Sequence, residues 1–342
     1  MANLVWGDTE TQFFYELNPS RVLDAVELLD LPVTGRCLQL NSLENRVYEV
    51  GLETESPEDW RSPDASRIAK FYRPGRWSRE QILEEHAFLL ELQEEEIPVI
   101  APCVIQGKTL FHLKEEGLFY CLFPKKGGRS PDEMPDPELE QVGRLLARIH
   151  SVGERKPAPH RLTLNPKTYG TDNLEAILKN RFIPTHLESR YQKLAEALLE
   201  AIKPLFLNVT LQRIHGDCHL GNLLWGSSGA FFLDFDDMVM GPPVQDIWLI
   251  VGGRDPESVR RREILLEAYE GMREFDHSTL NLIEPLRALR YIHFAAWIGK
   301  RWQDQAFQLA FPYYGSEKYW LTQIEDLREE LELITKTPQW SY

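Results

Sequence analysis

Two short segments of the 342-residue chain carry the groups that phosphoryl transfer from a nucleotide requires. The first contains His215-Gly216-Asp217-Cys218-His219 and ends at Asn222, and the second contains Leu233-Asp234-Phe235-Asp236-Asp237. In such reactions one carboxylate accepts the proton of the attacking hydroxyl. An amide oxygen and a second carboxylate hold the Mg²⁺ ions that neutralise the triphosphate. The order carboxylate, amide, carboxylate in Asp217, Asn222 and Asp234 therefore indicates an ATP-dependent, Mg²⁺-dependent phosphotransferase.

The residues around these groups predict how they are positioned. Residues 212–215 read as a short extended segment, and Gly216 permits a tight turn with positive φ. Two apolar runs, 222–225 and 231–233, are separated by a Gly-Ser-Ser-Gly turn, which predicts a β-hairpin. Such a hairpin places Asn222 beside Asp234. Asp217, on the loop before it, can then face the same pocket.

A lysine and a glutamate upstream suit the phosphate-binding part of a kinase. Lys70 lies in the apolar, strand-like run Arg67–Tyr72 and resembles the strand lysine that pairs with the α- and β-phosphates in kinases. An amphipathic helix is predicted over 81–92. Its Glu85 suits the glutamate that orients such a lysine, with Glu84 as the second candidate. The alternatives are a surface lysine on an edge strand and a solvated glutamate.

Two further segments are candidates for nucleotide contacts. No glycine-rich phosphate loop precedes Lys70, but residues 38–50 read as strand, polar turn, strand. Asn41 and Ser42 in that turn tolerate turn geometry and expose backbone N–H groups that can cover phosphates. The apolar strand 118–124 leads into a polar exit at 125–129. We expect adenine to contact the backbone there, from Leu122 to Lys125. An ordinary hairpin turn and an ordinary strand-to-loop transition are the alternatives.

Several blocks of sequence resemble those of the bacterial stress response kinase A family, which lies in the aminoglycoside phosphotransferase and choline kinase-like superfamily. The resemblance covers the chain from about residue 8 to its end. Its blocks are residues 40–48, 70–77, 81–86, 215–219, 241–248, 283–287 and 296–297.

This resemblance implies a fold and a set of roles. It implies an α+β, bilobal, protein-kinase-like fold with an antiparallel sheet and one key helix in the N-terminal lobe and a mainly helical C-terminal lobe. It also implies a cytoplasmic Ser/Thr protein kinase of stress response, with protein substrates and possible autophosphorylation. Asp217 would be the catalytic base, and Asn222 and Asp234 the Mg²⁺ ligands. The hairpin tip at 226–229 carries one extra residue relative to the family.

Other functions remain open from the sequence. A small-molecule kinase acting on an aminoglycoside-, choline- or homoserine-type hydroxyl could use the acidic residues Asp236, Asp237 and Glu284 to hold an amine. Asp236 and Asp237 could equally serve the metal or a structural hydrogen bond. A pseudokinase is disfavoured because the four key residues are present. His215 and His219 have the spacing of a helical zinc pair, but Gly216 argues against a helix there.

Composition limits the class of protein. The hydrophobic content of 43% is that of a globular chain, and no apolar run reaches the length of a membrane span. A net charge of −15 argues against nucleic-acid partners and suggests basic residues in a protein substrate. Four scattered cysteines predict reduced thiols. The segment Met1–Asp8 lacks the features of a secretory signal, so we expect a cytoplasmic protein with no membrane partner.

The remaining predictions concern organisation. The length fits two lobes, residues 1–124 and 125–342, joined at about 121–128. Helices are predicted over 18–31, from Asp136-Pro137 onward, and through most of the chain after 246. Asp246 either caps its helix or braces the catalytic loop. The helical spacing of Tyr291, Phe294, Trp297 and Ile298 favours a core stripe over a substrate groove.

Overall fold

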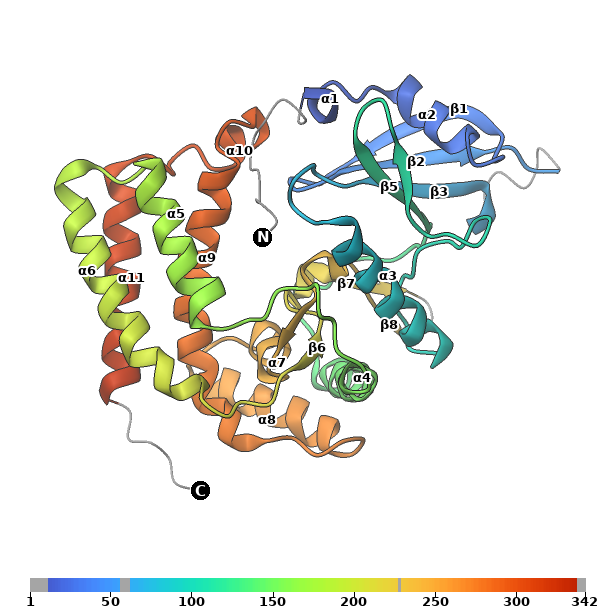
Figure 1. Cartoon of the computed structure of the whole chain (residues 1–342). Coiled ribbons are helices and arrows are strands. Elements are labelled where there is room, and N and C mark those ends of the chain that lie inside the picture. Colours follow the sequence, from blue (N-terminus) through green and yellow to red (C-terminus); the bar gives the residue numbers. More distant parts are fainter. Residues whose placement is uncertain (1–11, 56–61, 227–228, 337–342) are drawn as a thin grey trace. The chain divides into compact units, whose positions relative to one another are not determined.

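The protein is represented by a computed structural model that describes residues 12–55, 62–226 and 229–336 (Figure 1). The predictions for Met1–Asp8 and for the two residues at the hairpin tip, 227 and 228, lie outside the described residues. The chain forms two compact units. Unit 1 contains the described residues up to Glu133 and residues 220–236, and unit 2 contains Met134–His219 and the described residues from Asp237 onward. The predicted joint at about 121–128 stays a prediction.

Unit 1 is built on a five-stranded sheet in the order β1-β2-β3-β5-β4, with every neighbouring pair antiparallel. Lys70 on β3 lies opposite Val47 on β2 and Cys121 on β5, so it comes from the middle of the sheet. The predicted strands at 67–72 and 118–124 are confirmed. The strands are β1 Val33–Leu40, β2 Arg46–Leu52, β3 Ser66–Phe71, β4 Phe111–Leu113 and β5 Leu118–Pro124.

Three helices accompany this sheet: α1 Gln12–Tyr15, α2 Pro19–Glu27 and α3 Arg79–Glu94. Asn18 caps α2 by accepting a hydrogen bond from the backbone N–H of Arg21 at 3.0 Å. Ser78 and Gln81 form a capping box at the start of α3, which fixes where the helix begins. Both predicted helices are therefore present, with shifted ends.

A hairpin from the second half of the chain belongs to unit 1. It consists of β7 Leu223–Gly226 and β8 Gly229–Phe232. The backbone N–H of Phe232 donates to the carbonyl of Pro98 at 3.0 Å, which attaches the hairpin to the segment after α3. The N–H of Leu233 donates to the carbonyl of Asn222 at 2.9 Å. The predicted hairpin, with Asn222 beside the start of the Asp234 turn, is confirmed.

Unit 2 is mainly helical and carries one small sheet, in which β6 Gln212–Ile214 pairs antiparallel with β9 Val239–Gly241. Within this unit α4 packs against α8, and α5, α6, α9 and α11 pack together (Figure 1). The α+β class predicted from the sequence is confirmed. The helices are α4 Asp136–Glu154, α5 Asp172–Asn180, α6 Thr185–Ile202, α7 Val244–Ile250, α8 Pro256–Glu270, α9 Ile283–Lys300, α10 Gln305–Ala310 and α11 Glu317–Lys336.

Short 3₁₀ and π turns fill many of the connections: η3 Pro63–Ala65, η4 Pro166–Thr171, η5 Lys203–Phe206, η6 Leu220–Asn222, η7 Phe235–Asp237 and η8 His277–Leu282. All four cysteines are free thiols, as the sequence predicts. Across the described ranges, no helix combines the length and the apolar character needed to cross a membrane.

Candidate active site

Lys70 lies at the centre of a cluster of carboxylates in unit 1. Its ammonium nitrogen is 3.1 Å from Oδ1 of Asp236, 3.2 Å from Oδ1 of Asp234 and 3.9 Å from Oε1 of Glu85. Burial alone would lower the pKa of Lys70, but the negative charges of Asp236, Asp234 and Glu85 outweigh it and raise the pKa well above 10.5. Lys70 is therefore a fixed cation. The glutamate at this ion pair is Glu85 rather than Glu84.

The sequence left the role of Asp236 open, and the structure places it among cations. Asp236 is 3% exposed, and its Oδ2 lies 2.9 Å from Nη1 of Arg76 and accepts a hydrogen bond from Nδ2 of Asn45 at 3.3 Å. With Lys70 on the other oxygen, Asp236 neutralises two buried cations. Sequence reasoning missed Arg76, although a charged residue in the run Arg73-Pro74-Gly75-Arg76 directly after β3 was a visible signal.

The turn between β1 and β2, which contains Asn41 and Ser42, is tied to the end of β3. Arg73 donates from Nε to the carbonyl of Glu44 at 2.9 Å and from Nη2 to the carbonyl of Leu43 at 3.1 Å. The hydroxyl of Ser42 accepts from the N–H of Asn45 at 3.3 Å. These bonds fix a turn that lacks glycine, so its backbone is held in one place without a glycine-rich sequence.

A cavity of about 460 Å³ in unit 1 collects most of the predicted nucleotide contacts, and this volume is ordinary for a ligand pocket. Its lining includes the predicted residues Asn41, Ser42, Lys70, Glu85, Lys125 and Asp234. Apolar walls come from Val47, Ile68, Leu89, Ile100, Phe123 and Leu233. The arrangement suits a ligand with an apolar, planar part and an anionic part.

Leu122 is the predicted contact that does not line this cavity. Successive side chains of a strand face opposite sides of the sheet, and the side chain of Leu122 lies in the hydrophobic core, fully buried. Its carbonyl accepts a hydrogen bond from the N–H of Cys103 at 2.7 Å. The next residues, Phe123 to Lys126, line the cavity instead. Lys125 is held there by Glu49, 2.9 Å from its ammonium.

The candidate metal ligands Asn222 and Asp234 occupy the two ends of the β7–β8 hairpin. Asp234 has a backbone φ of 52°, a left-handed conformation that is uncommon outside glycine and that concentrates at functional sites. Its side chain is 56% exposed and lines the cavity. An amide oxygen and a carboxylate on neighbouring chain segments form a donor set that fits a hard divalent cation such as Mg²⁺.

In unit 2, Asp217 lies on a sharply turned loop after β6. Gly216 has a φ of 86°, and a Cβ there would overlap the carbonyl oxygen of Asp237, so only glycine fits. The carboxylate of Asp246 accepts from the N–H of His215 and from the N–H of Gly216, both at 2.9 Å. Asp246 therefore braces this loop; the helix cap is Pro243.

A guanidinium and an imidazole flank the carboxylate of Asp217. Nη1 of Arg290 lies 2.8 Å from its Oδ1, and Nε2 of His219 lies 3.4 Å from its Oδ2. Burial would raise the pKa of Asp217, but the hydrogen bond from His219 and the charge of Arg290 prevail and hold it well below 3.8. Asp217 is thus ionised and able to accept a hydrogen bond. Sequence reasoning missed Arg290, which carries no local signal.

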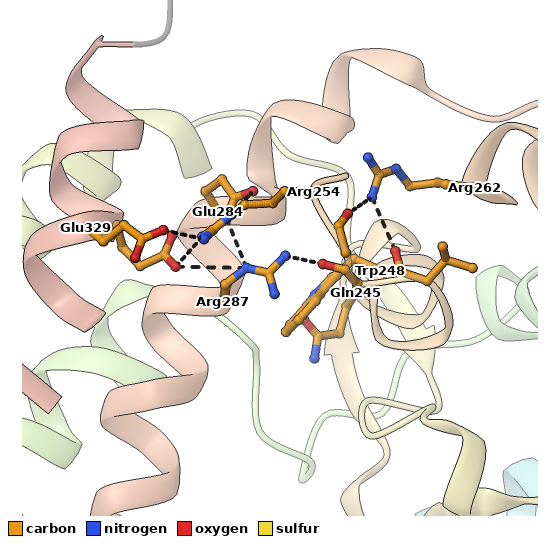
Figure 2. A network of polar contacts seen from close by, with 11 residues as sticks. Gln245, Trp248, Arg254, Arg262, Glu284, Arg287 and Glu329 are labelled. Carbon is orange, nitrogen blue, oxygen red and sulfur yellow. Dashed lines mark hydrogen bonds and ion pairs between the residues drawn. The ribbon is translucent and has the colours of Figure 1, made fainter. Parts of the chain in front are cut away.

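A second set of contacts reaches the same loop from the C-terminal helices (Figure 2). Gln245 donates from Nε2 to the carbonyl of Gly216 at 3.0 Å and accepts from the indole of Trp248 at 2.9 Å. The guanidinium of Arg287 lies 5.0 Å from the centre of the Trp248 ring. Arg287 in turn pairs with Glu284 at 2.9 Å.

The same set continues through Arg254. Its guanidinium lies 2.7 Å from Glu284 and 2.8 Å from Glu329, and it also pairs with Glu330 on α11. Ion pairs and stacked side chains therefore lead from α11 to Gln245 (Figure 2), which bonds to the carbonyl of Gly216.

The helical zinc pair is ruled out by the backbone. His215 follows β6 and His219 lies in an irregular segment, so the two are not on a helix. Within the described residues, no group of three or more His, Cys, Asp or Glu side chains is placed to hold a metal ion.

Comparison with known proteins agrees with this geometry. The sequence profile described as "Phosphotransferase enzyme family" matches residues 37–282. Stress response kinase A of Escherichia coli (strain K12) is 37% identical over 327 residues, which cover 95% of this chain and 96% of that protein. The serine/threonine protein kinase RdoA of Salmonella typhimurium (strain LT2) is 36% identical over the same length. The chain therefore belongs to the phosphotransferase enzyme family and, within it, to the stress response kinase A family.

Solved structures support the fold. Amicoumacin kinase hAmiN, in complex with AMP-PNP, Ca²⁺ and Ami, has a TM-score of 0.69 at 20% identity, covering 96% of this chain and 98% of that one. A microcompartment-associated aminopropanol kinase has a TM-score of 0.64 at 19% identity, covering 92% and 97%. The resemblance to a kinase-like phosphotransferase fold is thereby confirmed.

Proposed function

We propose that this phosphotransferase is a Mg²⁺-dependent, ATP-dependent protein kinase that acts on Ser and Thr hydroxyls, its own included, in a stress response. The observation that carries the proposal is the Lys70 cluster. One cavity brings together a fixed cation, a glutamate that orients it and an exposed carboxylate in a strained turn. Kinase chemistry requires these three groups at the phosphates of the nucleotide.

Each residue then has a role. Lys70, held by Glu85, would bind the phosphates, and the tied turn with Asn41 and Ser42 would cover them. Asn222 and Asp234 would hold Mg²⁺, which when bound neutralises charge on the triphosphate. Phe123 to Lys125 would contact the base of the nucleotide. Asp217 would accept the proton of the attacking hydroxyl.

Two observations favour a protein acceptor over an amine. Asp236 and Glu284, which could have held an amine, are both committed to ion pairs: Asp236 to Lys70 and Arg76, and Glu284 to Arg254 and Arg287. The relative RdoA is named a serine/threonine protein kinase. A small-molecule kinase is the second candidate, because the similar solved structures include an amicoumacin kinase and an aminopropanol kinase.

The test is a transfer assay with γ-labelled ATP and Mg²⁺. The acceptors are the protein itself, casein, histone, and a panel of amino alcohols and aminoglycosides, each with and without EDTA. We expect EDTA-sensitive label in protein-bound phosphoserine or phosphothreonine, and none with the Asp217→Asn variant. If label is found only in a small alcohol, that alcohol is the acceptor and the proposed protein acceptor is wrong. No transfer to any acceptor, together with no ATP binding, would refute the kinase function.

A further inference from the structure

One face of α9 carries a row of cationic and aromatic side chains that begins at the proposed base. At about 100° per residue, an α-helix brings five side chains onto an arc of roughly 120°: Arg290, His293, Phe294, Trp297 and Lys300. We refer to these five as the α9 face. The prediction of a core stripe holds for Ile298, which is fully buried, and is wrong for Phe294, which is 41% exposed.

Arg290 connects this face to the chemistry. Its guanidinium meets the carboxylate of Asp217 at 2.8 Å, and its side chain is 36% exposed. Among the described residues, Asp217 is the one carboxylate that forms an ion pair with it. A guanidinium offers five N–H donors in a planar fork. Any hydroxyl that approaches Asp217 therefore arrives beside a cation that can hold a second anion.

Lys300, at the far end of the face, belongs to a chain of polar contacts. Its ammonium donates to Oδ1 of Asn173 at 2.9 Å, and Nδ2 of Asn173 lies 3.1 Å from Nδ1 of His293. The His293 ring stacks on Tyr169, with 4.4 Å between ring centres. These contacts place Lys300 in a fixed position on the same side of α9 as Arg290.

The ammonium of Lys300 is partly desolvated. Burial, and after it the charge of Arg301, lower the pKa of Lys300 to about 8, while the charge of Asp172 opposes the shift. At neutral pH Lys300 is still mostly protonated, so the α9 face carries a partly desolvated positive charge at the end that contacts α5. Asp172 is itself paired with Lys167 at 2.7 Å.

The carboxylate of Asp217 is paired with the guanidinium of Arg290 and lies 3.4 Å from the imidazole of His219. Asp237 is the other carboxylate near Tyr169, whose pKa is raised first by burial and then by Asp237. Arg290 is the cation of the α9 face that meets Asp217. Further along the same face, Phe294 and Trp297 stack with ring centres 5.5 Å apart, and Lys300 follows at the far end.

We propose that the α9 face selects an acceptor whose hydroxyl is flanked by carboxylates: a Ser or Thr next to Asp or Glu, with Arg290 and Lys300 as the specificity-determining residues. This inference rests on the proposed protein kinase function. It reverses the expectation, drawn from the net charge of −15, that a protein substrate is basic near its target. Net charge sums the whole surface, whereas selectivity depends on the few charges beside the base.

The test uses three peptides of equal length, each with a single serine flanked on both sides by two Asp, two Asn or two Lys residues. Wild-type protein should have its highest kcat/KM on the Asp peptide. Arg290→Ala and Lys300→Gln should each lower the ratio of kcat/KM on the Asp peptide to kcat/KM on the Asn peptide about tenfold or more, equivalent to ~1.4 kcal/mol. Arg290→Glu should shift the preference to the Lys peptide.

Matched controls remove the same charges elsewhere. Arg190→Ala on α6 and Lys179→Gln on α5 change exposed residues and should leave the three-peptide ratios unaltered. The melting temperature and the ATP Kd of every variant report whether it is folded. Equal losses on all three peptides would overturn the proposal, because Arg290 would then act on the base or on the transferred phosphoryl group. A wild-type preference for the Lys peptide would overturn it as well.

Failure of the proposed function has a different signature. If wild-type protein labels no peptide but labels small alcohols, the protein acceptor is wrong. The inference is then tested by comparing phosphoryl transfer to 3-hydroxypropanoate, which is anionic, with transfer to ethanolamine, which is cationic. Preference for the anionic compound, lost in Arg290→Ala, supports an anion-selective α9 face. Preference for ethanolamine overturns it.

Discussion

The ammonium nitrogen of Lys70 lies 3.1 Å from Oδ1 of Asp236, two residues beyond the proposed metal ligand. Asp236 also meets Arg76 at 2.9 Å, so one buried carboxylate compensates two buried cations. Because both partners are almost fully buried, this ion pair is a determinant of stability as well as of the position of Lys70.

Asp236→Asn should therefore destabilise the protein. Removing one partner of a buried ion pair typically costs about 3–5 kcal/mol. Because Lys70 keeps Asp234 and Glu85 and Arg76 keeps Glu44, we expect a loss near the lower end of that range in the free energy of unfolding, measured with urea. Asp64→Asn is the matched control, because Asp64 is 87% exposed and pairs with Arg67 at 3.3 Å. It should cost less than about 1 kcal/mol. Equal effects of the two substitutions would contradict the structural role of Asp236.

Asp217→Asn should abolish turnover while ATP still binds. The cavity proposed to bind the nucleotide lies in unit 1 and does not include Asp217. We expect kcat to fall by orders of magnitude, with the ATP Kd, measured by calorimetry, changed less than about twofold. A variant that retains full kcat would remove Asp217 from its role as base.

The low pKa of the Asp217 carboxylate allows a prediction for kcat/KM on the acid side of its pH profile. Because the hydrogen bond from His219 and the charge of Arg290 hold the pKa of Asp217 well below 3.8, despite the opposing effect of burial, the base stays ionised throughout the neutral range. We expect no loss of kcat/KM attributable to Asp217 between about pH 5 and pH 7. Arg290→Ala should move its pKa upward. If kcat/KM of wild-type protein falls toward acid pH within this range and that of Asp217→Glu does not, the fall belongs to Asp217 and its pKa is not held low.

Asp234 calls for two substitutions, because it has both a charge and an unusual backbone. Asn tolerates the left-handed conformation that Asp234 adopts at φ 52°. Asp234→Asn should therefore weaken Mg²⁺-ATP binding and turnover together with little loss of stability. Asp234→Ala should lose the same binding and in addition about 1 kcal/mol of stability, from strain in the turn. Normal Mg²⁺-ATP binding by Asp234→Asn would exclude Asp234 as a ligand.

Local patterns predicted the elements and the reacting groups, and they failed where tertiary contacts decide. Lys70, Glu85, Asn222 and Asp234 could be proposed as site residues because strand, helix and hairpin signals lie directly in the neighbouring residues. Leu122 was assigned to the nucleotide site because backbone contacts were expected at the exit of its strand, and a strand pattern does not reveal that the carbonyl of Leu122 already accepts from the N–H of Cys103. Arg290 could not be found, since only the packing of unit 2 brings it to Asp217.

Glu330 on α11 should give the protein a pH-dependent stability. Burial and the nearby charge of Glu284 raise its pKa to about 7, although Arg254 opposes the shift. The groups that face it are Arg254, Arg287 and Glu284. A carboxyl with a raised pKa keeps its proton in the folded state between its usual pKa of 4.5 and about 7, while the unfolded chain has already lost it. Its contribution to stability therefore decreases as pH rises through this window.

Urea unfolding of wild-type protein and Glu330→Gln at several pH values between 5 and 8 measures this contribution. The amide does not titrate, so the stability of the variant relative to wild type should increase with pH, by at most about 3 kcal/mol over the window. Glu332→Gln, on an exposed turn of the same helix, is the control and should show no such trend. Because the contacts of Arg254 and Arg287 lead to Gln245 and the carbonyl of Gly216, kcat should follow the same pH dependence in wild type and lose it in Glu330→Gln. A stability difference that stays constant from pH 5 to pH 8 would show that Glu330 is ionised throughout and that the connection to the catalytic loop does not respond to pH.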